Sequence, residues 1–293
     1  LPIWLASLAA HPTQRPDLRA VLAALDGARE TGADRLLAEH EAAWRARWAD
    51  AHVAITGDPE LELAVRFGLF HLMSSAGDVG EAAVGARGLT GPGYAGHVFW
   101  DADVFVLPFL AATHPAASRA MLEYRRRRLG AARERARSQG HAGCRFPWES
   151  AADGREATPT HTVALDGSRL TVRTGELEEH IVADVAWAAW QHHLWSGDRW
   201  VVDGGARDLI VETARYWASR VEEDVDGTVH LRGVIGPDEY HEDVDDNAYT
   251  NVLVRWHLRR GAGLLAGRDA GPADRGEAER WRELAAALVD GYD

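Results

Sequence analysis

Three short segments of the chain place carboxylates beside aromatic side chains where a folded core needs neither. They are Gly96-His97-Val98-Phe99-Trp100-Asp101, Phe146-Pro147-Trp148-Glu149-Ser150 and Gly236-Pro237-Asp238-Glu239-Tyr240-His241-Glu242. A carboxylate accepts paired hydrogen bonds from neighbouring hydroxyls, and an aromatic plane covers the apolar face of a sugar ring, so this combination is typical of carbohydrate sites. Taken singly, each segment has an ordinary alternative: Asp101 caps a helix, Glu149 pairs with an arginine, and the tryptophans pack in the core.

The third segment offers a candidate proton donor. A Gly-Pro turn precedes Asp238 and would hold it and Glu239 in place. Cleavage of a glycosidic bond needs an acid that protonates the leaving oxygen and that stays protonated near neutrality. Negative charge on Asp238, Glu242 and Asp243 favours the protonated form of Glu239. An acidic loop exposed to solvent has the same composition, so composition alone leaves both interpretations open.

The elements that must position these segments are almost all helices. Hydrophobic periodicity predicts helices at 59–75, 99–112, 115–139, 177–197, 205–223, 246–260 and 276–290, and one β-hairpin at 161–174. Apolar residues surround the helix at 59–75, so we expect it to be buried. Long loops at 76–98, 140–176 and 224–245 precede every second helix. In an up-and-down array these loops share one rim, which brings the three segments together.

This arrangement predicts an all-α fold, an (α/α)6 toroid with a mouth built from loops and a small β-hairpin insertion. The helices do not suffice to close the ring, so we expect an incomplete barrel. Residues 1–10 lack the basic stretch that precedes a signal core, and we interpret them as part of a longer protein. We expect residues 1–50 to be a helical lead-in or linker from a missing N-terminal domain, and 51–293 to be the first and middle part of the barrel.

Composition excludes several classes of function. Lys plus Arg number 32 against 45 Asp plus Glu, giving a net charge of −13, and all of the cations are arginine. We therefore expect no nucleic-acid and no membrane partner, and no apolar run reaches the roughly 18 residues of a membrane span. The single cysteine, Cys144, allows no internal disulfide and no multi-cysteine zinc site. We expect a cytoplasmic location and no bound metal.

Two further motifs have ordinary explanations. Residues 91–96 match the G-x-G-x-x-G pattern, but no strand precedes them, so the dinucleotide-binding interpretation fails. The four consecutive arginines Arg125 to Arg128 would point in different directions on a helix. They therefore cannot form one phosphate pocket, and we expect a solvated outer helix.

Five stretches of the chain resemble glycoside hydrolase family 65, the family of maltose, trehalose and kojibiose phosphorylases. They are GLTGPGYAGHVFWDAD (88–103), FPWESAADGREATP (146–159), EEHIVADVAWAAWQ (178–191), GDRWVVDGGARDLIVETARYWASR (197–220) and GVIGPDEYHEDVDDNAYTN (233–251). The resemblance implies an (α/α)6 barrel, which agrees with the placement of the loops. It also implies an inverting mechanism in which Glu239 protonates the glycosidic oxygen.

The same resemblance implies roles for the first two segments. Trp100, Asp101, Trp148 and Glu149 would hold the glucosyl residue that is transferred. The family usually has Glu after FWDT, where this chain has Asp103, so the role of that acid does not carry over directly.

The implied reaction is phosphorolysis of an α-glucosidic disaccharide of the maltose, trehalose or kojibiose type, giving β-glucose 1-phosphate and a free sugar. Alternatives are an inverting hydrolase with a second carboxylate about 6.5 to 9.5 Å away, and a non-catalytic saccharide-binding barrel. We expect inorganic phosphate as co-substrate, no other cofactor, and a homodimer of the complete protein. In the family the phosphate site comes from later barrel segments, so we expect this chain to be inactive by itself.

Overall fold

The computed structural model describes residues 18–291 except 92, 165 and 268–269. Residues 1–10, interpreted above as part of a longer protein, lie outside this range. The described chain forms two compact units that meet in sequence at Met73 and Ser74. None of the described helices is long and apolar enough to cross a membrane.

The described part of the first unit, from residue 18 onward, consists of helices. They are α2 (Leu18–Thr31), α3 (Ala33–Ala51) and α4 (Pro59–Ser75), the last of which runs into the second unit. Trp44 of α3 stacks on Phe70 of α4, with ring centroids 5.0 Å apart. The prediction that the 59–75 helix is buried is wrong in this structure: Leu63 and Phe67 are 69% and 65% exposed, and only Met73 is buried. The apolar residues surround α4, and α3 packs against it on the side of Phe70.

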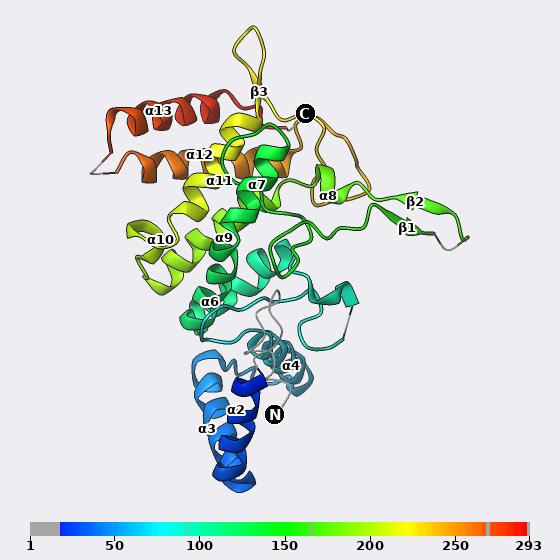
Figure 1. Ribbon diagram of the computed structural model, residues 1–293, viewed down its shortest axis with the longest axis vertical. Helices are drawn as coiled ribbons and strands as arrows, with labels where there is room; N and C mark the ends of the chain where they lie inside the picture. Colours follow the sequence, from blue (N-terminus) through cyan, green and yellow to red (C-terminus); the bar gives the residue numbers. More distant parts are fainter. Residues whose placement is uncertain (1–17, 92, 165, 268–269, 292–293) are drawn as a thin grey trace. The chain divides into compact units, whose positions relative to one another are not determined.

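The second unit holds the remaining helices (Figure 1). In chain order they are the short 3-10 helix η1 (Gly93–Gly96), the π-helix η2 (Ala102–Val106), α5 (Leu107–Thr113), α6 (Pro115–Arg127), α7 (Leu129–Ser138), α8 (Thr174–Leu177), α9 (Ile181–Ser196), α10 (Trp200–Asp203), α11 (Asp208–Arg220), α12 (Ala248–Leu265) and α13 (Pro272–Ala287). Every helix predicted from periodicity is present, although the ends differ by several residues. The predicted 115–139 helix is divided at Arg128, whose φ of −101° and ψ of 7° depart from helical values.

Two sets of helices pack in layers in this unit. The helices that follow the long loops, α5, α9 and α12, pack side by side through α9. Each also packs on the next long helix in the chain: α6, α11 and α13 respectively. Figure 1 shows α12 and α13 lying alongside one another. The core between the layers includes Val185, Leu209, Trp217 and Leu258, all with no exposed surface. Alternation of this kind is the arrangement that the predicted toroid requires.

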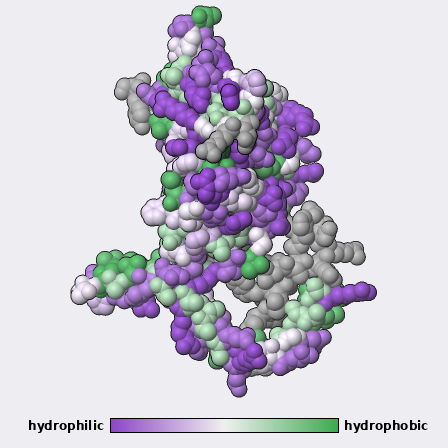
Figure 2. All heavy atoms as spheres, turned by 90° about the vertical axis from the view of Figure 1, so that its left-hand side faces the viewer, coloured by the Kyte–Doolittle hydropathy of each residue, from purple (hydrophilic) through white to green (hydrophobic). Residues whose placement is uncertain are grey.

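The strands are short and few among the described residues. β1 (His161–Val163) pairs antiparallel with β2 (Arg169–Thr171), and β3 (Glu222–Glu223) pairs antiparallel with β4 (Val229–His230). The first pair is the predicted hairpin. It is exposed along both strands and projects from the helices in Figure 1. Hydrophilic side chains predominate on the face of the second unit in the upper part of Figure 2.

The prediction for the arginine run is wrong for two of its four members. Arg126 and Arg127 do lie toward solvent, where both bond Glu123. Arg125 and Arg128 are instead buried, with exposed fractions of 1% and 6%. Successive helical residues point about 100° apart, so a run of four must send some side chains inward. Here the inward pair finds carboxylate and carbonyl partners, which is the condition for burying a guanidinium.

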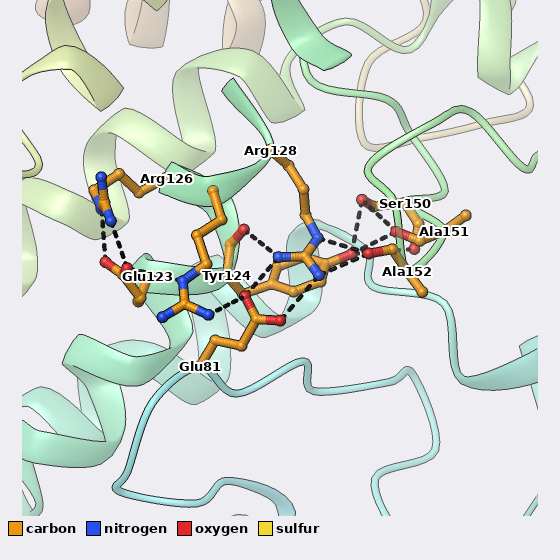
Figure 3. Close-up of polar contacts among 9 residues, drawn as sticks. Glu81, Glu123, Tyr124, Arg126, Arg128, Ser150, Ala151 and Ala152 are labelled. Atoms are coloured by element: carbon orange, nitrogen blue, oxygen red, sulfur yellow. Dashed lines mark hydrogen bonds and ion pairs between the residues drawn. The ribbon is translucent and has the colours of Figure 1, made fainter. Parts of the chain in front are cut away.

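Arg128 ties α6 to the loop that follows the second aromatic segment (Figure 3). Its guanidinium donates to Glu81 at 2.8 Å and to the carbonyl oxygen of Ala152 at 2.6 Å. It also lies 3.9 Å from the ring centroid of Tyr124. The Tyr124 hydroxyl, from α6 itself, bonds the hydroxyl of Ser150 at 2.9 Å. The end of the PWES segment and the residues after it are thus held by α6 and by the residue that directly follows it.

Candidate functional site

The long loops of the second unit meet at one rim, as the sequence predicts. Val98 and Ser150 exchange backbone hydrogen bonds of 3.0 and 2.9 Å, which join the first loop to the second. The amide of Ile235 donates to the carbonyl oxygen of Leu177 at 2.9 Å, which joins the third loop to the segment that leads into α9. All three aromatic and acidic segments therefore belong to one connected surface of loops.

Trp100 and Trp148 approach each other from two different loops. Their ring centroids are 6.5 Å apart and the planes are inclined by 30°. Trp148 is buried and Trp100 is partly exposed, with Tyr249 6.1 Å from it and Phe99 6.1 Å from Trp148. Two large aromatic rings at this separation, one of them open to solvent, can cover an apolar sugar face.

The carboxylates that follow these tryptophans differ in their surroundings. Asp101 precedes η2, is exposed, and makes no capping hydrogen bond with its side chain. The alternative in which Asp101 is a helix cap is therefore wrong. Glu149 is buried, and its Oε1 lies 2.7 Å from Nδ1 of His97. The partner of Glu149 is thus a histidine from the first segment, which links the first two segments through side chains as well as backbone.

Glu156 fixes the backbone at Trp148 and Glu149. Its carboxylate accepts hydrogen bonds from the Trp148 amide at 2.9 Å and from the Glu149 amide at 3.1 Å. It also accepts from the Thr158 hydroxyl at 2.7 Å and pairs with Arg135 at 2.9 Å. One side chain therefore sets the conformation of both predicted sugar-binding residues in this loop.

The loop that carries Glu239 is closed at its base. Val234 and Val244 exchange backbone hydrogen bonds of 3.0 and 2.9 Å. A Cβ added at Gly236 would lie 2.3 Å from the side-chain nitrogen of Asn247. The Asn247 side chain is itself held in place, because its oxygen caps α12 by accepting a hydrogen bond from the backbone amide of Thr250. Glycine is therefore required for the loop to pass the start of α12. Glu239 itself is exposed at the tip.

The acids beside Glu239 have partners of their own. Asp238 accepts from the Tyr240 amide at 3.1 Å and lies 2.8 Å from Nδ1 of His241. These hydrogen bonds lower the pKa of Asp238. Asp243 pairs with Arg173 at 3.2 Å. Two of the three acids that the sequence places beside Glu239 therefore have partners of their own.

A buried group of ionisable residues, missed in the sequence, lies beside the tryptophans. Nδ1 of His180 is 2.6 Å from Asp184, and Nε2 is 3.3 Å from Glu178. The Tyr249 hydroxyl donates to Asp184 at 2.8 Å. The sequence does show one indication of this group: four ionisable side chains lie within seven residues, 178–184, at the start of an otherwise apolar helix. His180 also packs against Trp100, with ring centroids 4.8 Å apart.

Two of these residues have strongly shifted pKa values. Burial acts to lower the pKa of His180, but the hydrogen bonds and charges of Asp184 and Glu178 outweigh it and raise that pKa to about 9. Burial raises the pKa of Glu178 to about 7, against the hydrogen bond and charge of His180, and the charge on Glu239 adds to the rise. Ionisable groups shifted in this way gather at functional sites.

Asp103 belongs to a different interaction. It pairs with Arg125 of α6 at 2.5 Å, and both side chains are almost fully buried. Arg125 also donates to the carbonyl oxygen of Phe99 at 3.3 Å. Asp103 therefore anchors η2 to α6.

Within the described parts of the chain, His, Cys, Asp and Glu residues form no group of three that could hold a metal ion.

Comparison with known proteins identifies the family. A family model, the glycosyl hydrolase family 65 central catalytic domain, matches residues 66–290. A kojibiose phosphorylase of Caldanaerobacter subterraneus subsp. tengcongensis is 40% identical over 278 residues, which cover 89% of this chain and 36% of the relative. A kojibiose hydrolase of Flavobacterium johnsoniae is 39% identical over 221 residues, covering 75% of this chain and 31% of the relative.

The fold has a solved counterpart. A putative kojibiose phosphorylase from the human microbiome superposes with a TM-score of 0.81 over 94% of this chain and 41% of its own, at 21% sequence identity. This likeness confirms the predicted toroidal fold. The chain spans about a third of the length of the curated relatives it matches. Since the family model covers residues 66–290 of a 293-residue chain, the protein belongs to glycosyl hydrolase family 65.

Proposed function

We propose that the protein is an inverting disaccharide phosphorylase. It transfers a glucosyl residue from an α-glucosidic disaccharide of the kojibiose, trehalose or maltose type to inorganic phosphate. The products are β-glucose 1-phosphate and a free sugar. No metal or organic cofactor takes part in this scheme, and phosphate is the co-substrate.

The observation that carries this proposal is the approach of Trp100 and Trp148, each followed directly by a carboxylate, at 6.5 Å between ring centroids. A glucosyl ring in this scheme lies against the indole rings, and its hydroxyls donate to Asp101 and Glu149. Asp101 is exposed and free of a capping role, so it is available for such bonds.

Glu239 is the proton donor in the proposed mechanism. It stands at the tip of a loop closed at its base, and its charge acts on Glu178 beside the tryptophans. Protonation of the glycosidic oxygen by Glu239 assists departure of the free sugar while phosphate attacks the anomeric carbon from the opposite face, which inverts its configuration. Glu239 ends the step ionised and regains a proton from solvent.

The second candidate is an inverting hydrolase, in which a second carboxylate activates water in place of phosphate. It is favoured by the relatedness of this chain to a kojibiose hydrolase at 39% identity. The kojibiose phosphorylase relative, matched over more of the chain, favours phosphorolysis. A non-catalytic saccharide-binding barrel would use the tryptophan pair alone.

Product analysis separates the three candidates. The protein that carries this chain is incubated with kojibiose, trehalose and maltose, each with and without phosphate, and glucose and glucose 1-phosphate are followed. We expect phosphate-dependent release of β-glucose 1-phosphate from one of the three. Glucose released equally without phosphate would favour the hydrolase, and sugar binding without turnover would favour the binding barrel.

Three further features belong to the same proposal. Residues 1–50 lead into the catalytic barrel, and 51–293 supply its first and middle part. The complete protein acts as a homodimer. It works in the cytoplasm, where a single buried cysteine, Cys144, is kept reduced.

A further inference from the structure

His180 is enclosed by acceptors on both sides of its ring. The side chain has no exposed surface, and Nδ1 and Nε2 lie 2.6 and 3.3 Å from oxygens of Asp184 and Glu178. A neutral imidazole donates from only one nitrogen, whereas an imidazolium donates from both. Two carboxylates facing the two nitrogens therefore favour the protonated ring.

Three aromatic rings surround the same imidazole nearly at right angles. The centroid distances are 4.8 Å to Trp100, 5.4 Å to Trp148 and 5.2 Å to Tyr249, with interplanar angles of 84°, 75° and 81°. Perpendicular contacts of this kind are favoured between aromatic rings, and a positive charge on one of them adds an attraction to its neighbours. His180 is thus the group that both tryptophans of the proposed sugar site share.

Tyr249 and Asp184 hold the imidazole in place from the other side. Tyr249 comes from α12 and donates its hydroxyl to Oδ1 of Asp184, whose Oδ2 faces His180. Rotation of the ring would break the contact with Asp184 or with Glu178. The orientation of His180 is therefore fixed by groups from two helices and the segment before α9.

We propose that His180 is a positioning residue: its protonated ring fixes Trp100 and Trp148 in the orientation that binds a glucosyl ring, and this binding weakens when the ring loses its proton. The inference rests on the proposed function, because it assigns His180 a part in that same sugar site. The residue does not touch the sugar in this scheme and acts through the two indole rings.

The charges around the imidazole determine the direction of the pH effect. Glu178 and Asp184 face it directly, the charge of Glu239 acts on Glu178, and that of Arg125 acts on Asp184. The net result is a pKa of about 9 for His180. A raised pKa means that the ring is charged below pH 9 and neutral above it, so affinity for glucose is retained up to about pH 8 and lost as pH rises through 9.

The side chains that commonly titrate near this pH range in proteins are those of lysine, cysteine and tyrosine. The sequence has no lysine. Burial raises the pKa of Cys144 to about 12, and burial together with the charge of Asp184 raises that of Tyr249 further. An unperturbed histidine is neutral above pH 8. A change in sugar affinity that has its midpoint near pH 9 and is lost in His180→Gln would therefore point to His180.

The test measures the charge of the ring and the affinity for D-glucose separately. In protein labelled with ¹⁵N-histidine, the resonance lost in His180→Gln should report an imidazolium at pH 8 and a neutral ring at pH 10. By calorimetry, His180→Gln should bind D-glucose about tenfold more weakly at pH 8, because the two carboxylates lose a shared partner and the rings lose their orientation. A tenfold preference of glucose for the charged form predicts about a fivefold loss for the unsubstituted protein between pH 8 and pH 10.

His161→Gln is the matched control, since His161 lies exposed on β1, in the hairpin that projects from the helices in Figure 1. It should leave affinity and its pH dependence unchanged. A neutral ring at pH 8, or unchanged glucose affinity in His180→Gln, would overturn the role of His180 while leaving the sugar site standing. Failure of the unsubstituted protein to bind D-glucose would overturn the sugar site and the positioning role together. If His180→Gln does not fold, the pH dependence of the unsubstituted protein decides: a flat profile refutes the inference.

Discussion

Replacement of Glu156 by alanine tests whether one carboxylate sets the conformation of the second aromatic segment. The side chain accepts from the amides of Trp148 and Glu149 at 2.9 and 3.1 Å and pairs with Arg135 at 2.9 Å. Glu156→Ala would leave the amides of Trp148, Glu149 and Thr158 and the Thr158 hydroxyl without this acceptor, and would remove one of the partners of Arg135. Each stranded buried donor costs about 1 to 3 kcal/mol.

The expected loss must be reduced for partial exposure. The side chains of Glu156 and Arg135 are each 18% exposed, so water can replace part of the lost interaction. We expect Glu156→Ala to lower the free energy of unfolding by about 2 to 4 kcal/mol. Glu156→Gln keeps one acceptor oxygen and should lose about half as much. Glucose affinity should fall in the same order, because the backbone that carries Trp148 and Glu149 is displaced.

Urea denaturation followed by tryptophan fluorescence measures the stability, and calorimetry with D-glucose measures the affinity. Arg155→Ala is the control from the same loop. The Arg155 side chain is 77% exposed, and its ion pair with Asp153 is long, at 3.7 Å. A surface change of this kind stays within about 0.5 kcal/mol. If Glu156→Ala proved no more harmful than Arg155→Ala, the reasoning that Glu156 orders the loop would be refuted.

Three further predictions concern the proposed sugar site and the buried ion pair between Asp103 and Arg125. Glu239→Gln should reduce turnover by roughly 10² to 10⁴ while leaving sugar binding largely intact, as steady-state kinetics and calorimetry would show; near-normal turnover would remove Glu239 from the role of acid. Asp101→Ala should weaken D-glucose binding by about 1 to 3 kcal/mol through lost hydroxyl partners, and unchanged affinity would exclude Asp101 from the sugar contacts. Asp103→Ala should destabilise the fold by about 3 to 5 kcal/mol because Arg125 remains buried without its anion, whereas the double variant Asp103→Leu with Arg125→Met should recover most of that loss in urea denaturation. Equal losses in the single and double variants would contradict this account of the pair.

The order of helices and the shared rim could be predicted because both depend on local patterns. Periodicity locates α9, α11 and α12, and the alternation of long and short connections assigns the long loops to one end of the array. The exact ends of helices could not be predicted in the same way. Arg128, where the predicted helix is divided, bonds Glu81 and Ala152, which are distant in sequence.

The sequence predicted a buried helix at 59–75 and a solvated Arg125, and both predictions were wrong for the same reason. Periodicity describes which side chains share a helical face, but the partner that covers each face is set by the tertiary fold. An apolar helix stays exposed where none of the described residues covers it, as at Phe67. A charged side chain is buried where a carboxylate meets it, as Asp103 meets Arg125.

Sequence analysis did not identify the buried ionisable residues near the site, because they lie in a stretch whose apolar pattern predicts a hydrophobic core helix. His180 and Asp184 are four apart and so share one face at the start of α9, among fully buried residues such as Ile181 and Val185. A helix stabilised only by apolar packing would not keep three ionisable groups there, since burying each costs free energy unless it is paired. Their presence in an apolar stretch therefore indicates that they pair with one another. It does not indicate what lies beside them, and only the fold brings Trp100 and Trp148, from two other loops, against the imidazole.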